Sequence, residues 1–104
     1  MRKLKDPKMP HGITQISTDF IRHNLCLLDE VRTVRITYDG ELDLHTEVID
    51  KFGDRLITDG FSVGYSGEGP TGLLRLLEDL GMDIDKRPSD VSLEVGMSFK
   101  WSKV

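Results

Sequence analysis

Cysteine is almost absent from this chain of 104 residues, because Cys26 is the only one. A single thiol cannot close an intramolecular disulfide or supply a paired-thiol metal site, which agrees with a reducing compartment. Long apolar runs are also absent. No stretch approaches the roughly 18 residues that span a bilayer, and the N-terminus lacks the apolar segment of a secretory signal. The sequence therefore predicts a cytoplasmic protein with no membrane partner.

Positive charge is scarce outside the N-terminus. Four basic residues against Asp6 give residues 1–8 a charge of +3, and because the whole chain carries −4, the remaining residues carry −7. An acidic body is unfavourable for binding nucleic acid, which requires a basic face to attract the phosphate backbone. We therefore expect no nucleic acid partner and interpret the basic arm as a solvated tail.

Length and composition indicate one small globular domain. With 38% hydrophobic and 31% charged residues, the chain can bury a modest core and does not have the composition of a disordered protein. Its length suits one domain and is too short for two ordinary ones. Residues 1–12 include Pro7, Pro10 and Gly12 but few apolar side chains, which predicts a flexible basic lead-in before a single α+β domain over residues 13–104.

The first element of the domain is predicted to be a helix over residues 18–29. Residues 17–19 are Ser, Thr and Asp, whose side chains accept hydrogen bonds from the free amides at a helix start. An apolar stripe follows at Ile21, Leu25 and Leu28. Because short apolar runs do not distinguish a helix from a strand, the boundary between this helix and the next strand stays open.

A β-hairpin is predicted next. Residues 31–38 are rich in β-branched side chains and form its first strand, the second covers residues 42–49, and Asp39 with Gly40 gives the turn. A two-residue loop would put the apolar residues of the second strand on the polar face, so a three-residue loop over residues 39–41 is predicted. The expected cross-strand pairs are Tyr38 with Leu42, Ile36 with Leu44 and Val34 with Thr46.

The second half of the domain adds an extended segment and a helix. Residues 51–54 predict a turn, and the extended segment covers residues 55–65. Pro70 suits the first position of a helix that runs to Leu80, with leucines at helical spacing and Gly81 as the C-terminal cap.

The last element is predicted to be a long half-buried strand from Val91 to Trp101, because apolar and polar residues alternate along it. Phe99 and Trp101 are expected in the core, with a homodimer through this terminal strand as the alternative. The order α-β-β-β-α-β predicts an α+β fold in which a four-stranded, mostly antiparallel sheet carries two helices on one face.

The most distinctive stretch is the glycine-rich segment, residues 64–72, where Gly67, Gly69 and Gly72 match the pattern G-x-G-x-x-G ahead of a helix. Glycines let a backbone approach a ligand and free helix amides attract anions, but the same glycines also suit a structural turn. The chain is too short for the repeated βαβ units of a dinucleotide-binding domain, and the lysine of a Walker phosphate loop is missing. The candidate binding residues are Tyr65, Ser66, Gly67, Glu68, Gly69 and Thr71.

Two further groups of residues contain side chains suited to metal binding or nucleophilic catalysis. Asp43, His45 and Glu47 share one face of a strand, as metal ligands would, but Arg35 on the partner strand can pair with them, and no metal site is expected. Cys26 lies three residues after a histidine, yet no oxyanion site accompanies it, so it is interpreted as a buried small hydrophobic residue. No catalytic residue and no cofactor are assigned.

The leading hypothesis is a small non-enzymatic binding or protein-interaction domain. The sequence pattern brings together no acid, base or nucleophile, which disfavours an enzyme. The expected partner is another protein, recognised by the glycine-rich segment before the second helix. The alternative is a small anionic ligand, a phosphorylated metabolite or nucleotide bound at the same segment, with or without enzymatic activity.

Overall fold

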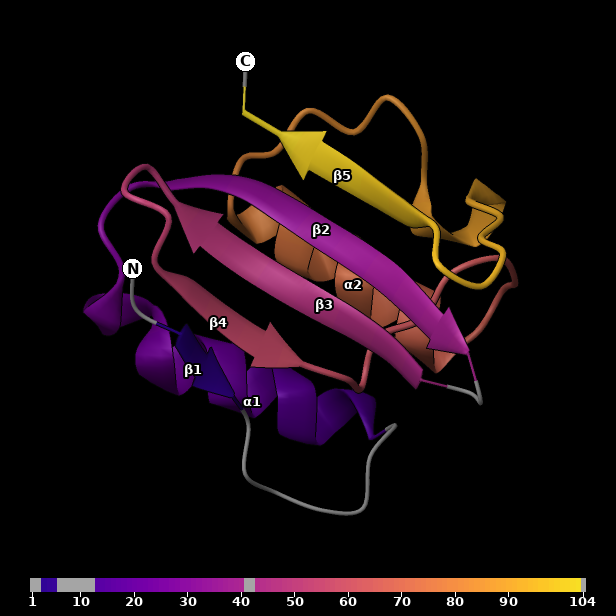
Figure 1. Cartoon of the computed structure of the whole chain (residues 1–104), viewed down its shortest axis with the longest axis horizontal. Coiled ribbons are helices and arrows are strands. Elements are labelled where there is room, and N and C mark those ends of the chain that lie inside the picture. The colour runs from indigo at the N-terminus through magenta and orange to yellow at the C-terminus, as the bar shows by residue number, and fades with distance from the viewer. Residues whose placement is uncertain (1–2, 6–12, 41–42, 104) are drawn as a thin grey trace.

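The computed structural model describes residues 3–5, 13–40 and 43–103. Its strands are β1 (Lys3–Lys5), β2 (Val31–Gly40), β3 (Asp43–Asp50), β4 (Arg55–Thr58) and β5 (Ser98–Ser102), its helices are α1 (Thr14–Asn24) and α2 (Glu68–Asp79), and Leu25–Leu27 and Pro88–Asp90 form short 3₁₀ turns. The strands make one sheet in the order β1-β4-β3-β2-β5, with both helices on the far side in Figure 1. This confirms the predicted α+β fold, two helices on one face of an antiparallel four-stranded sheet in the order α-β-β-β-α-β.

The short strand β1 extends that sheet to five strands. Leu4 pairs in parallel with Leu56 of β4 and packs against the core. The sequence did not indicate this strand, because β1 has too few residues for a periodic pattern and its pairing partner is distant in the chain. The other residues of the lead-in, 1–2 and 6–12, lie outside the described part of the chain.

The hairpin of β2 and β3 keeps the predicted faces but not the predicted register. Tyr38 pairs with Leu44 instead of Leu42, and the other pairs are shifted by the same two positions. The difference arises from a β-bulge between Tyr38 and Gly40, since Gly40 pairs with Asp43. The extra residue in β2 puts Leu44 on the same face as Tyr38, and the φ of +98° at Gly40 suits glycine in a bulge. Leu42 lies outside the described residues.

Helix α1 begins at Thr14, four residues before the predicted start. Ser17 does not cap the helix: its hydroxyl is buried, lies 2.5 Å from the hydroxyl of Thr58 and accepts the backbone N–H of Gly60 at 2.7 Å. Thr14 also donates to the carbonyl of Gly60 at 2.7 Å. The Ser17 hydroxyl, which resembled a helix cap, therefore fastens α1 together with Thr14 to the end of β4 and the segment that follows it.

The structure also corrects the interpretation of Cys26, which is exposed instead of buried. The α-helix ends at Asn24, and the 3₁₀ turn that follows changes the direction in which side chains project. Of the predicted stripe Ile21, Leu25 and Leu28, Ile21 is fully buried, whereas Leu25 and Leu28 are partly buried and pack against the core.

Helix α2 confirms the second predicted helix, although it begins two residues earlier, at Glu68. Pro70 therefore lies in the first turn, where its missing N–H breaks no helical hydrogen bond. The predicted cap at Gly81 is present, with a φ of +73°. The N–H of Gly81 donates to the carbonyl of Glu78, and the N–H of Met82 donates to the carbonyl of Leu77, which is a Schellman motif.

The structure contains only part of the long strand that was predicted at the C-terminus. β5 begins at Ser98, and the alternation over residues 91–97 does not form a strand: Val95 is 66% and Met97 is 47% exposed. Gly96 adopts a φ of +85°, and the N–H of Met97 donates to the carbonyl of Glu94 in a turn. This glycine interrupts an alternating pattern that is typical of a strand.

The extended segment predicted over residues 55–65 is regular only through β4, up to Thr58. Its continuation is an irregular connection to α2, in which Phe61 is buried. The turn at residues 51–54 is confirmed: Gly53 has a φ of +88°, and the Asp50 carboxylate accepts the backbone N–H groups of Phe52 and Asp54, each at 2.9 Å.

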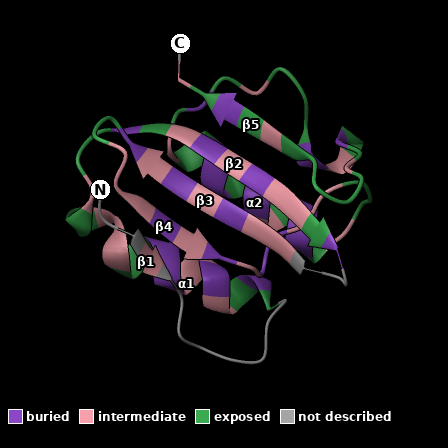
Figure 2. Cartoon of the chain, in the orientation of Figure 1, coloured by how far each residue is buried: buried purple, intermediate pink, exposed green. Residues whose placement is uncertain are grey.

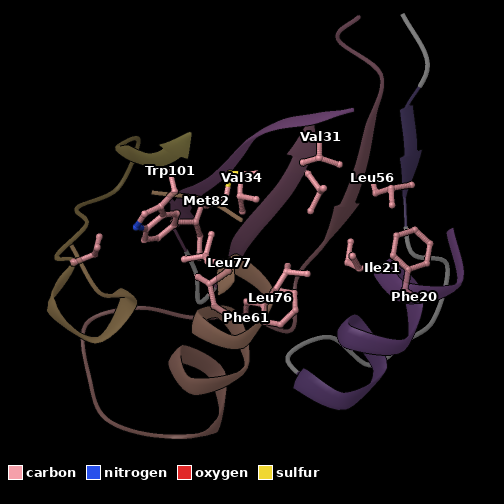
Figure 3. Packing of buried hydrophobic residues seen from close by; sticks show 14 residues of the cluster. Phe20, Ile21, Val31, Val34, Leu56, Phe61, Leu76, Leu77, Met82 and Trp101 are labelled. Carbon is pink, nitrogen blue, oxygen red and sulfur yellow. The ribbon is translucent and has the colours of Figure 1, made fainter. Parts of the chain in front are cut away.

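The core lies between the inner face of the sheet and the two helices. Buried and partly exposed residues alternate along β2 and β3 in Figure 2, as expected for strands with one covered face. Ile21 from α1, Leu77 from α2 and Trp101 from β5 all contribute to this layer, with Trp101 and Ile21 toward opposite sides of it (Figure 3). Trp101 is 1% exposed and donates its indole N–H to the carbonyl of Lys86 at 2.7 Å, which confirms its predicted place in the core. No helix among the described residues is long and apolar enough to cross a membrane.

Candidate functional site

The glycine-rich segment lies at the end of the sheet where β2 turns into β3 (Figure 1). A cleft of about 430 Å³ beside it is lined by Tyr65, Glu68 and Leu44, among others. A groove of about 280 Å³ adjoins this cleft through Leu44 and is lined mainly by apolar side chains that include Val63 and Leu93. The segment, which includes the start of α2, therefore borders a partly apolar hollow at the end of the sheet.

Two glycines of the motif are required by close packing. A Cβ atom on Gly69 would lie 1.9 Å from Ser62 Oγ, and one on Gly72 would lie 2.4 Å from Thr14 Cγ2. Both distances are far below van der Waals contact. These glycines let α2 approach the segment after β4 on one side and α1 on the other, which is a structural reason for the sequence pattern.

Tyr65 is the exposed large hydrophobic side chain of the segment, with 53% of its surface accessible to solvent. Its hydroxyl lies 2.8 Å from Ser62 Oγ, and its ring lies against Gly67, where a Cβ would come within 2.6 Å of the ring. Gly64, just before it, has a φ of +88° and bends the chain. The tyrosine is thus exposed but held in one orientation by the hydrogen bond and the glycine contact.

The start of α2 offers few donors to an anion. Gly67 occupies the N-cap position, and Thr71 already donates its N–H to the Gly67 carbonyl. Pro70 has no N–H, and Gly69 is buried. The exposed Glu68 carboxylate lies in the first turn, where it already interacts favourably with the positive end of the helix dipole. This arrangement favours recognition through side chains over binding of a phosphate by backbone amides.

The structure distributes the predicted site residues over three hollows. Tyr65, Glu68 and Gly69 line the cleft already described. Glu68 also borders, together with Gly67 and Thr71, a groove between α1 and α2. Ser66 lies elsewhere, beside Pro70 and Arg87. Of the predicted residues, Tyr65 and Glu68 are therefore the exposed ones that face the cleft beside the apolar groove.

Besides Tyr65, several apolar residues at this end of the molecule are exposed that were not predicted as surface residues. Four of the six exposed large hydrophobic side chains among the described residues are Ile13, Tyr65, Val95 and Met97. Ile13 lines the cleft, and the residue 91–97 loop reaches the adjoining groove through Leu93. We call the surface formed by Ile13, Leu44, Tyr65, Leu93, Val95 and Met97 the apolar end. The positive-φ Gly96 was the sequence signal that could have indicated it.

Acidic side chains border the apolar end. Asp59 and Glu68 line its cleft, and Glu94 is exposed in the loop that carries Val95. Apolar surface edged by carboxylates complements a partner that presents apolar and basic side chains together.

Two of the three residues with metal-ligand spacing, His45 and Glu47, are engaged in other interactions, and the side chain of Asp43 lies outside the described part of the chain. His45 Nε2 lies 2.6 Å from Asp39 Oδ2, whereas Glu47 binds Arg35 and Arg55, which confirms the pairing predicted for Arg35. Burial raises the pKa of Glu47, but hydrogen bonds from the two arginines outweigh it, so the pKa lies below its ordinary value. Within the described residues, no three His, Cys, Asp or Glu side chains are grouped as metal ligands.

Comparison of the chain with models of known protein families, with curated proteins and with solved structures finds no match.

Proposed function

We propose that this chain is a small non-enzymatic protein-interaction domain that recognises its partner with the apolar end, which includes Tyr65, and with the adjoining Glu68. The observation that carries the proposal is that the exposed side chains of Ile13 and Tyr65 line a cleft bordered by Asp59 and Glu68, beside a groove of mainly apolar side chains. Exposed apolar surface bordered by polar groups is typical of protein interaction sites. The partner presents apolar side chains flanked by lysine or arginine.

Tyr65 is the expected centre of this contact. Tyrosine contributes a large apolar surface and a polar hydroxyl, and it is enriched among the residues that dominate binding energies. Its fixed orientation also reduces the entropy lost on binding. Glu68 adds charge complementarity, which mainly controls the association rate and the choice of partner.

The test is affinity capture from an extract of the cells that produce this protein, with the retained proteins quantified for several variants. We expect at least one protein to be retained by the wild type and lost with Tyr65→Ala and Glu68→Lys. Phe52→Ala and Glu78→Lys are matched controls, since Phe52 is 68% exposed at the opposite end of the sheet and Glu78 is an exposed carboxylate farther along α2. The same retained proteins with all five forms would refute the proposal.

The alternative function, binding of a small anionic ligand, can be distinguished from binding of a protein partner by the Glu68→Lys variant. Glu68→Lys removes a like charge from the start of α2, so a phosphate-bearing ligand should bind more tightly to this variant. A thermal-shift panel of nucleotides and sugar phosphates measures this directly. Stabilisation that is larger in Glu68→Lys than in the wild type would support the ligand and oppose the protein partner.

A further inference from the structure

The sheet face that is turned away from the helices carries a group of charged side chains. Arg35 of β2 and Arg55 of β4 flank Glu47 of β3, with Arg35 Nε 3.0 Å from Glu47 Oε1 and Arg55 Nη1 2.7 Å from Glu47 Oε2. Lys100 of β5 pairs in register with Arg35. Side chains alternate between the faces of a strand, and the neighbours of these residues in sequence, such as Val34, are buried on the helix side. We call Arg35, Glu47, Arg55 and Lys100 the basic cluster.

The basic cluster has more positive than negative charge. Beside the single carboxylate of Glu47, which Arg55 shares, the cluster presents the two cations Arg35 and Lys100, whereas the whole chain carries a net charge of −4. Arg35 and Lys100 occupy directly opposite positions of two neighbouring strands, where like charges lower stability. Within the described residues, Lys100 has no ion pair. A negatively charged partner lying over this face would relieve the repulsion.

The contacts of Glu47 prepare Arg35 for such a partner. The Glu47 side chain is 13% exposed and lies beneath the guanidinium groups, whereas the Arg35 side chain is 39% exposed. Arg35 directs Nε and Nη2 at one oxygen of Glu47, so Nη1 is not used in this ion pair. A guanidinium held in a fixed orientation is well suited to bind a further carboxylate with defined geometry.

The surroundings of the basic cluster favour an acidic peptide over a nucleic acid as its partner. Phe99 and Trp101 of β5 contact each other and lie on the helix side, so the described residues of the open face provide no phenylalanine, tyrosine or tryptophan ring on which a base could stack. The acidic remainder of the molecule repels a long polyanion. A short segment with a few carboxylates requires only the local excess of positive charge.

We propose that the open face of the sheet binds an acidic segment of a protein partner, an extended stretch rich in aspartate and glutamate, through Arg35 and Lys100, while Glu47 and Arg55 hold the Arg35 guanidinium in place. This surface is separate from the apolar end and concerns a partner of opposite charge. It therefore goes beyond the function proposed above.

The test uses fluorescence anisotropy with a short labelled peptide of alternating glutamate and serine, compared with a peptide in which glutamine replaces glutamate. We expect the wild type to bind the glutamate peptide alone, and the affinity to fall as salt is added. Lys100→Gln should weaken binding about threefold, the effect of losing one exposed ion pair. Lys100→Glu should weaken binding about tenfold, because charge reversal adds repulsion to that loss. Lys86→Gln removes an exposed positive charge outside the cluster and should leave binding unchanged, as should Tyr65→Ala.

Arg35→Gln provides a second variant, with circular dichroism to verify that the fold is retained. It should lose binding to at least the same extent as Lys100→Gln. Equal binding by wild type, Lys100→Glu and Arg35→Gln would overturn the proposal, as would wild-type protein that does not bind the glutamate peptide. Tighter binding of a labelled single-stranded oligonucleotide than of the peptide would assign the face to nucleic acid instead.

Discussion

Replacement of Gly69 by alanine tests whether the glycine pattern serves packing. An added Cβ would lie 1.9 Å from Ser62 Oγ, 3.1 Å from Ser62 Cβ and 3.2 Å from the Ser62 backbone nitrogen. The hydroxyl could rotate away only by losing its hydrogen bond to Tyr65. The two remaining contacts involve atoms that move only with the backbone.

Two opposing terms set the magnitude. Alanine is more favourable than glycine inside a helix by about 1 kcal/mol. Overpacking of a tight contact costs about 1–3 kcal/mol, and loss of one hydrogen bond adds about 1 kcal/mol. We therefore expect Gly69→Ala to lower the free energy of unfolding by about 1–3 kcal/mol, which corresponds to a decrease in Tm of roughly 4–24 °C for a domain of this size.

Urea denaturation and differential scanning calorimetry measure this effect. Thr71→Ala is the matched control, because Thr71 is exposed on the same helix and only the helix propensity changes. Ser62→Ala in the Gly69→Ala background should restore part of the stability, giving a coupling of about 1 kcal/mol in a double-mutant cycle. Gly69→Ala as stable as the wild type, or more stable, would refute the packing explanation of the motif.

Three further predictions follow from single residues. The pKa of Glu47 is lowered in the folded state, so its contribution to stability is present above the ordinary pKa of 4.5 and is lost as the pH falls through the folded pKa. Glu47→Gln should show a smaller loss of stability on acidification in urea titrations, and an unchanged pH profile would contradict the ion-pair argument. Trp101→Ala should cost about 3 kcal/mol with no change in the sedimentation coefficient, because the indole is buried within the monomer; an unchanged Tm with altered sedimentation would place the strand at an interface. Isothermal titration with zinc should show no stoichiometric binding, and micromolar binding abolished by His45→Ala would overturn this expectation.

The sequence by itself determined the elements whose patterns are local and uninterrupted. The β-branched run of β2 and the leucine stripe of α2, with its terminal Gly81, are found where they were predicted. The alternation of apolar residues also fixed which side of β2 and β3 faces the core. These signals are reliable because each follows from the period of one element and from the burial of one face.

The tertiary structure alone decided the features that depend on residues distant in the chain. The hydroxyl of Ser17 suited a helix cap equally well, and only the partner at Thr58 shows that it joins α1 to the sheet. The alternation before Met97 matched a strand, but a strand needs a neighbour along its whole length, and Gly96 turns the chain away. Both candidate surfaces likewise arise from strands and loops that strand pairing brings together, so no local sequence pattern could specify them. The period of a sequence determines which face of an element is buried, whereas the packing of the whole domain determines which elements lie beside it.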